Sequence, residues 1–179
     1  MTRNKIAYAI RSIGGIILSG QIAMSASAQS NEAKNLKETI QWGETKEGFS
    51  LSISLDKREI SRGQPVLVTV RIKNVSDMEL RLVETDSEKD YSFVLKDSEG
   101  KELPKLRYQK RLEETKEEFR RKATIISPGQ VIEYKTNLGR RFDLSLEGEY
   151  SIQAQRQVLT NGGVGSVTLV SNIEIVIIR

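Results

Sequence analysis

The chain has 179 residues and a formal net charge of +4, and it contains no His and no Cys. A His-assisted serine or cysteine nucleophile therefore cannot be built, and neither can a zinc site of His and Cys side chains within one chain. With 37% hydrophobic residues the composition is that of a folded protein, which leaves carboxylate, Lys, Tyr and Ser side chains for any chemistry.

Residues 1–28 have the pattern of a secretory signal peptide. They begin with three basic residues, continue with an uncharged run from Ser12 to Met24, and end in Ala26-Ser27-Ala28, which fits a signal peptidase site. The alternative is an uncleaved membrane anchor. The uncharged run has only 13 residues, whereas a helix that spans a bilayer needs about 20. We therefore expect cleavage near Ala28 and export to the periplasm or the exterior.

Removal of residues 1–28 changes the charge balance. These residues carry three basic side chains and no acidic one, so 25 Lys and Arg remain against 24 Asp and Glu, a net charge of +1. A nucleic-acid partner inferred from overall charge loses most of its support. No later segment is long and apolar enough to cross a membrane. Residues 29–45 are polar and are predicted to be a flexible lead-in to a folded domain at residues 46–179.

Alternating apolar and polar side chains predict strands in the first half of this domain. The predicted strands are residues 49–55, 66–73 and 91–97, with a weaker one at 78–83. Turn-prone residues follow the second strand at Asn74–Asp77, which also fits a glycosylation sequon. The acidic segment 84–90 is predicted to be a solvated loop, because it lacks the glycine and the full ligand pattern of an EF-hand; a calcium site is the alternative.

Residues 105–122 interrupt the alternation with a helical pattern. Tyr108, Leu112, Thr115 and Phe119 recur at helical spacing, which predicts a short charged helix inserted between strands. One interpretation is a docking surface, and the other is a solvated face that covers a sheet edge, which the mixed charges favour. The candidate docking residues here are Arg107, Lys110, Arg111, Arg120, Arg121 and Lys122.

A corner and a strand are predicted in the stretch Asp143–Arg156, after a strand at residues 131–137. Tyr150, Ile152 and Ala154 share one face of the predicted strand. Gly148 stands two residues before Tyr150, as in the tyrosine corner of immunoglobulin-like sandwiches, where the Tyr hydroxyl bonds backbone a few residues upstream. Gly148 and Tyr150 are therefore predicted to be structural, with the hydroxyl bonded within residues 142–146.

A hairpin and a long strand complete the domain. The connection at 159–166 contains Asn161, Gly162 and Gly163, and it lacks the spacing and the Lys of a phosphate-binding loop. In the closing strand, residues 167–178, the predicted inward face runs through Val167, Leu169, Ser171, Ile173, Ile175 and Ile177. About seven strands with turns between them predict an all-β, immunoglobulin-like antiparallel sandwich.

Several of these motifs together resemble bacterial immunoglobulin-like modules. The chain is most similar to the intracellular proteinase inhibitor domain family, over roughly residues 49–157. The resemblance implies the sandwich fold and an inhibitory activity, but its turn and corner motifs identify no inhibitory residue. The chain departs from the family in its expected export and in the charged insertion. The motifs are Ile72–Asp77, Tyr91-x-Phe93-x-Leu95-x-Asp97-x-x-Gly100, Pro128-Gly129 followed by Tyr134, and Gly148-x-Tyr150-x-Ile152-x-Ala154.

Three functions follow from these patterns. The first is a non-enzymatic module that binds another protein or a cell-envelope component through its loops, which include Asn161–Gly163, or through the charged insertion. The second, which only the family resemblance implies, is a proteinase inhibitor, with loops 84–90 and 159–166 as candidates for an exposed loop that enters a protease cleft. The third is a carboxylate enzyme, which is disfavoured because the clustered glutamates of residues 113–118 do not face each other across a cleft. No catalytic residue, metal or cofactor is expected.

Overall fold

Nine strands and two short α-helices make up the part of the chain that the computed structural model describes, residues 39–114, 122–160 and 164–179. The strands are β1 (Phe49–Leu55), β2 (Glu59–Ile60), β3 (Leu67–Asn74), β4 (Leu80–Glu84), β5 (Ser92–Lys96), β6 (Lys122–Ile126), β7 (Val131–Asn137), β8 (Gly148–Leu159) and β9 (Ser166–Ile178). The helices are α1 (Ser87–Asp90) and α2 (Arg107–Glu114). Neither helix is long and apolar enough to span a bilayer.

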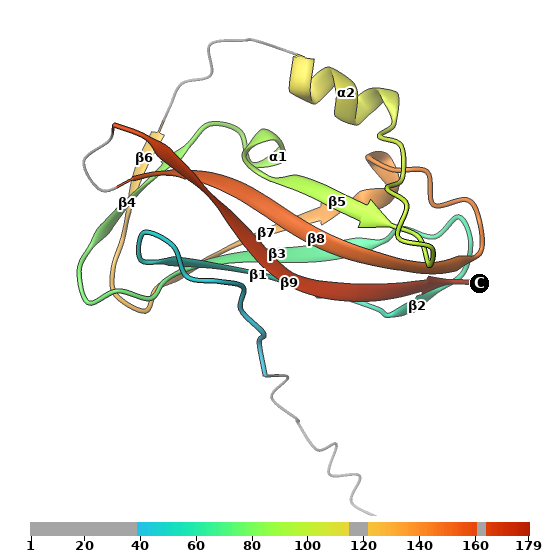
Figure 1. Cartoon of the computed structure of the whole chain (residues 1–179), viewed down its shortest axis with the longest axis horizontal. Helices are drawn as coiled ribbons and strands as arrows, with labels where there is room; N and C mark the ends of the chain where they lie inside the picture. Colours follow the sequence, from blue (N-terminus) through green and yellow to red (C-terminus); the bar gives the residue numbers. More distant parts are fainter. Residues whose placement is uncertain (1–38, 115–121, 161–163) are drawn as a thin grey trace, which may run out of the picture. The chain divides into compact units, whose positions relative to one another are not determined.

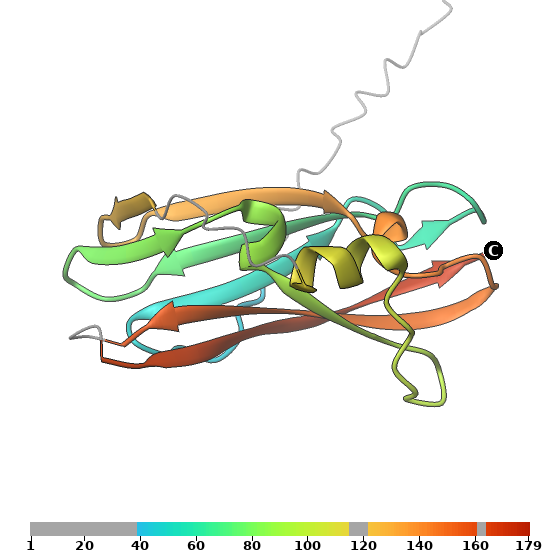
Figure 2. The ribbon, with the colours of Figure 1, turned by 90° about the horizontal axis from the view of Figure 1, so that it is seen from above.

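The strands form three sheets, and the two larger sheets face each other as layers (Figures 1 and 2). One has the order β1-β3-β7, the other has the order β2-β9-β8-β5, and β4 pairs with β6. All of these pairings are antiparallel except that of β2 with β9. The core lies between the layers, where burial of each aliphatic side chain stabilises the fold by about 1.5–3 kcal/mol. Fully buried core residues include Leu51, Val70, Ile72, Leu95, Ile152, Leu169 and Val176.

The strand order is that of an immunoglobulin-like domain. In such domains strands A, B and E pack against strands C, F and G, and here β1, β3 and β7 pack against β5, β8 and β9. At the corner between β7 and β8, the Tyr150 hydroxyl donates to the Leu146 carbonyl oxygen at 3.0 Å. Gly148 begins β8 with a φ of 155°, which residues with a side chain rarely adopt. The predicted fold class is therefore confirmed.

Local features depart from the sequence prediction at several places along the chain. The described residues form nine strands instead of about seven. The two strands that were not predicted are β2, which has only two residues, and β6, which begins at the last residue of the segment assigned to a helix. Lys122 is therefore in a strand, where it pairs with Glu84, and the helix expected over 105–122 is α2; residues 115–121 lie outside the described part. Within the expected loop 84–90, the Asp86 side chain caps α1 by accepting from the Glu88 N–H at 2.9 Å.

A β-bulge in β9 changes which side chains face the core. Two β9 residues, Ser171 and Asn172, lie opposite the single β8 residue Ala154. Ser171 is buried, but after the bulge the buried positions pass to the even-numbered residues. The predicted inward face is therefore wrong for Ile173 and Ile175, which are 59% and 37% exposed, and for Ile177, which is half-buried on the same outer face.

The same bulge lets Asn172 join the two large sheets. Its side-chain amide accepts from the Ile53 N–H at 2.8 Å and donates to the Ile53 carbonyl at 3.1 Å, as a neighbouring strand would. Gly43 of the lead-in lies between β1 and β9 and donates its N–H to the Leu51 carbonyl of β1. A Cβ on Gly43 would lie 1.9 Å from the Val170 carbonyl oxygen, so only glycine fits between β1 and β9.

Candidate functional site

A buried arginine lies on the inner face of β8, at the opposite end from Tyr150. The alternation of β8 carries this face through Tyr150, Ile152 and Ala154 to Arg156, which is 3% exposed. Burial of a lone guanidinium is unfavourable, because its charge and its N–H donors lose their water. Arg156 therefore requires partners inside the protein.

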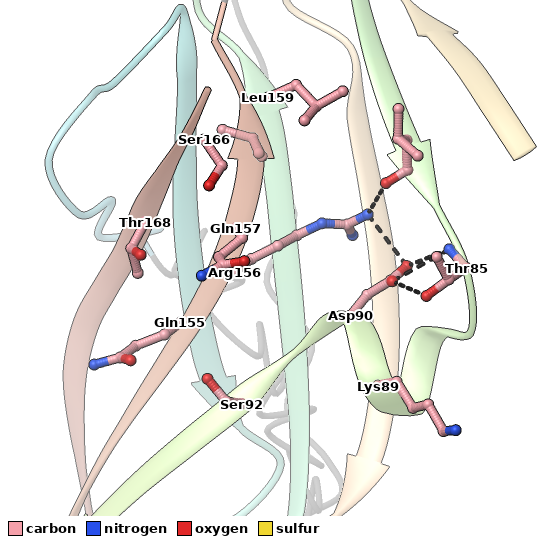
Figure 3. A pocket seen from close by; sticks show the side chains of 12 residues that line it. Thr85, Lys89, Asp90, Ser92, Gln155, Arg156, Gln157, Leu159, Ser166 and Thr168 are labelled. Atoms are coloured by element: carbon pink, nitrogen blue, oxygen red, sulfur yellow. Dashed lines mark hydrogen bonds and ion pairs between the residues drawn. The ribbon is translucent and has the colours of Figure 1, made fainter. Parts of the chain in front are cut away.

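Three residues far from Arg156 in the sequence provide these partners, and Figure 3 shows the contact with Asp90. Nη1 donates to the Tyr91 hydroxyl at 2.6 Å. Nη2 donates to the Val83 carbonyl at 3.2 Å and pairs with the Asp90 carboxylate at 3.3 Å. Nε has no hydrogen-bond partner among the described residues. We call Arg156, Asp90, Tyr91 and the Val83 carbonyl the Arg156 clasp; it links β8 to β4, to α1 and to the chain entering β5.

Asp90 is held in the clasp by the turn that contains α1. Thr85 donates to the Asp90 carboxylate from its backbone N–H, at 3.1 and 3.2 Å, and from its hydroxyl at 2.6 Å. Asp90 is the last residue of α1, so the helical turn capped by Asp86 brings its carboxylate back toward Thr85. The Asp90 side chain is only 10% exposed. The carboxylate is therefore fixed, although its segment is predicted to be a solvated loop.

Tyr91 connects the clasp to the core. Its ring stacks on that of Tyr134 in β7, with the centroids 5.5 Å apart. The guanidinium of Arg156 lies 4.7 Å from the centroid of the Tyr91 ring. Burial raises the pKa of the Tyr91 hydroxyl above its ordinary value, although the charge and hydrogen bond of Arg156 act in the opposite direction. The phenol is therefore neutral near pH 7 and serves as an acceptor and a packing surface.

A groove of about 490 Å³ lies beside the clasp (Figure 3). β5 pairs with β8 only as far as Ser92, which lies opposite Gln155. Beyond that point β8 continues to Leu159 with β9 on one side, and no strand among the described residues pairs with its other edge. The groove runs along this open edge, and Val83, Thr85, Lys89 and Asp90 contribute to its opposite side. Its neutral polar side chains include those of Ser92, Gln155, Gln157, Ser166 and Thr168.

The groove lining supplies hydrogen-bond donors and acceptors. Side-chain amides and hydroxyls can donate and accept hydrogen bonds without requiring a charged partner. The charges of Arg156 and Asp90 are engaged with each other, so neither group is placed as a free acid or base. Within the described ranges, no group of three or more Asp and Glu could hold a metal ion.

The predicted docking residues do not come together at this groove. Arg107, Lys110 and Arg111 are exposed on α2, Lys122 is exposed on β6, and none of them lines the groove. Gly148 and Tyr150 lie at the other end of β8. The remaining predicted residues lie outside the described part of the chain, namely Arg120, Arg121, Asn161, Gly162 and Gly163.

Sequence reasoning missed both charged residues of the clasp. A signal for Arg156 exists, because the inward alternation of Tyr150, Ile152 and Ala154 leads to it, and a charged residue at a core position requires a buried partner. No such signal identifies Asp90. It is one acidic residue among several in its segment, and its contact with Arg156 spans 66 residues of sequence.

Comparison with known proteins identifies no family. No protein-family model matches the sequence, and no curated protein matches it. Among solved structures the chain is similar to the C-terminal domain of Wzt, with 15% identity, a TM-score of 0.46, and coverage of 77% of this chain and 76% of that one. It is also similar to the Northeast Structural Genomics Consortium target SoR45 (10% identity, TM-score 0.42, coverage 74% and 88%) and to the sporulation control protein Spo0M from Bacillus subtilis (13%, 0.41, 74% and 49%). Likeness at this level carries no information about function.

Proposed function

We propose that the protein is an exported, non-enzymatic binding module of the bacterial envelope or exterior, and that its partner occupies the groove beside β8. The construction of the groove carries this proposal. One side is the open edge of a sandwich strand, and the other is held in place by the buried pair of Arg156 and Asp90. A groove that is already formed reduces the conformational entropy lost on binding.

The lining favours a neutral partner that forms many hydrogen bonds. Gln155, Gln157 and Thr168 supply amide and hydroxyl groups. The charge of Arg156 is balanced by Asp90, which leaves Lys89 as the one further charged residue of the lining. A net charge of +1 over residues 29–179 gives no strong long-range attraction to nucleic acid. A protein or a cell-envelope component therefore suits the groove better than a polyanion.

Export is supported by the sequence of residues 1–28, which lie outside the described part of the chain. Intact mass measurement of the protein recovered from its native cells tests this part of the proposal. The expected mass is that of residues 29–179, because cleavage follows Ala28. A mass that includes residues 1–28 would contradict it.

Site-specific photocrosslinking in the native envelope tests the binding site. A photoreactive residue at Gln157, in the groove, is expected to capture a specific partner. The same residue at Val131, which is 38% exposed on β7 and does not line the groove, is not expected to capture it. Thr168→Arg places a long side chain in the groove and should abolish capture at Gln157. Equal capture at both positions, or capture that survives Thr168→Arg, rules out this groove.

A proteinase inhibitor is the second candidate, and the connection between β8 and β9 favours it. Leu159 is 49% exposed and Val164 is 96% exposed, so this hairpin presents apolar side chains to solvent. The other loop considered, 84–90, is less suitable, because α1 and Thr85 hold it in a helical turn. Serine, cysteine and metalloproteases assayed with the purified protein test this function. Inhibition that Val164→Asp abolishes would support it, and absence of inhibition would reject it.

A further inference from the structure

We infer that the groove accepts an extended peptide of another protein, which adds as a strand to the open edge of β8. This inference rests on the proposed function and specifies the chemistry of the partner. The pairing of β5 with β8 ends where Ser92 lies opposite Gln155. The incoming peptide would pair with β8 beyond this point, from Arg156 onward. The sheet would then continue along β8 toward Leu159.

The backbone of β8 directs hydrogen-bonding groups into the groove. Thr160 donates its N–H to the Gly165 carbonyl at 3.0 Å, and Ala154 donates its N–H to the Ser171 hydroxyl of β9 at 2.9 Å. The even-numbered residues in this part of β8 therefore bond toward β9, and in an antiparallel ladder the alternate residues bond to the other side. The N–H and C=O groups of Gln157 and Leu159 consequently point to the open edge.

The Arg156 clasp separates the open edge of β8 from β4. The Val83 carbonyl at the end of β4 accepts from the Arg156 guanidinium at 3.2 Å, so a side chain spans the distance between β4 and β8. The space that remains is about 490 Å³. The four β8 residues beyond β5 extend for about 13 Å, at roughly 3.3 Å per residue. This space suits a few residues of one extended chain.

The chemistry of the edge selects a peptide. Donors and acceptors that alternate at the spacing of a strand are matched by another peptide backbone. Edge strands are commonly protected by Lys, Pro or a bulge, and β8 has no Lys or Pro and no bulge of its own from Arg156 to Leu159. Its one charged residue here, Arg156, points inward and is paired with Asp90, so it does not repel a second strand.

Peptide selection followed by backbone methylation tests the inference. Decapeptides displayed on phage are selected against the full chain, and the tightest binder is synthesised with an N-methyl group at each position in turn. Strand addition predicts a period of two: methylation at alternate positions weakens binding at least about tenfold, because each removes a backbone hydrogen bond, and the positions between have little effect. A response without this period overturns strand addition, as does a selection that yields no binder.

Matched variants of the protein assign the binding to this edge. Gln157→Pro removes the N–H that points to the groove, and proline is tolerated where that N–H does not belong to the ladder. Gln157→Ala keeps the N–H, so it should weaken the selected peptide less than Gln157→Pro. Equal effects of the two variants would overturn the assignment. If Gln157→Pro does not fold, Leu159→Pro and Leu159→Ala provide the same comparison.

The experiments separate this inference from the proposed function. Capture at Gln157 in the envelope together with an aperiodic methylation scan would retain the binding module and reject strand addition. A glycan or a second copy of the chain as the captured species would have the same consequence. If the photoreactive residue at Gln157 captures no specific partner in a protein that keeps Thr168, the proposed function itself is rejected.

Discussion

The two ends of β8 are fixed in different ways, although Tyr150 and Arg156 lie on the same face of one strand. Tyr150 bonds the Leu146 carbonyl, four residues away in the sequence. Arg156 bonds Tyr91 and Val83, which are 65 and 73 residues away. The first contact needs only a local turn, whereas the second requires β4, α1 and β8 to be assembled first, at a greater cost in loop closure. A local motif can therefore indicate the corner, but the clasp emerges from the whole fold.

The two ends also differ in charge. A cavity of about 410 Å³ at the corner is lined by the carboxylates of Asp97, Glu99, Glu102, Asp143, Glu147 and Glu149. Hydrogen bonds from Ser145 lower the pKa of Asp143. Burial raises the pKa of Tyr150, and the charges of Asp143 and Asp97 add to this effect. The groove at the clasp has one carboxylate in its lining, which is paired, so it is the end better suited to a neutral peptide backbone.

Removal of the clasp arginine should give the largest loss of stability. Arg156→Met leaves Asp90, Tyr91 and the Val83 carbonyl without their shared donor, so we expect the free energy of unfolding to fall by about 3–5 kcal/mol. Urea denaturation measures this loss. The double variant Arg156→Met, Asp90→Leu should lose less, because no unpaired charge stays buried. A single-variant loss as small as that of Tyr150→Phe would contradict the difference between the two ends.

Removal of the corner hydroxyl should have a smaller effect. Tyr150→Phe eliminates one hydrogen bond, to the Leu146 carbonyl, and leaves the ring in place, so a loss of about 1–2 kcal/mol is expected in the same measurement. Its effect should add to that of Arg156→Met, since the two sites share no partner. A neutral Tyr150→Phe would mean that the ring alone holds the corner.

Alkaline pH should weaken both ends through their phenols. The pKa values of Tyr91 and Tyr150 are raised from 10.0 in the folded protein, so the unfolded chain loses these protons first. The contribution of each phenol is fully present below pH 10.0 and is lost as the pH rises through the folded pKa. Urea midpoints measured from about pH 9 to about pH 11 should therefore decline more steeply in the wild type than in Tyr91→Phe or Tyr150→Phe. Identical slopes would contradict the shifts.

The basic residues of α2 should contribute least. Arg107→Ala and Lys110→Ala alter side chains that are exposed on α2, so each should change the free energy of unfolding by less than about 0.5 kcal/mol. Gln109 on the same helix is a matched control. It is 3% exposed and accepts from Arg141 at 3.1 Å, so Gln109→Ala should cost more. A larger loss in Arg107→Ala would show that the charged face supports the sandwich.

The features that the sequence predicts are those with short-range causes. Alternation over a few residues is sufficient for β1 and β7, and the spacing of Gly148 and Tyr150 indicates the corner. The bulge in β9 could not be predicted, because this strand has isoleucines on both faces and its pattern therefore contains no information about phase. At the candidate site, the burial of Arg156 was predictable from alternation. Its partners were not predictable, and neither was the end of the β5 pairing at Gln155, which leaves the rest of the β8 edge open among the described residues.

β9 contains one residue more than its pairing with β8 requires. If Asn172 were deleted, Ser171 would remain opposite Ala154, and every later side chain would keep its present face, because the missing residue and the phase change cancel. The two bonds to Ile53 would disappear, together with the bond that the Asn172 side chain donates to Glu174 and the one that its carbonyl accepts from the Ser171 hydroxyl. Deletion of a single codon would therefore remove this side-chain link between the two sheets and leave each core residue of β9 on its present face.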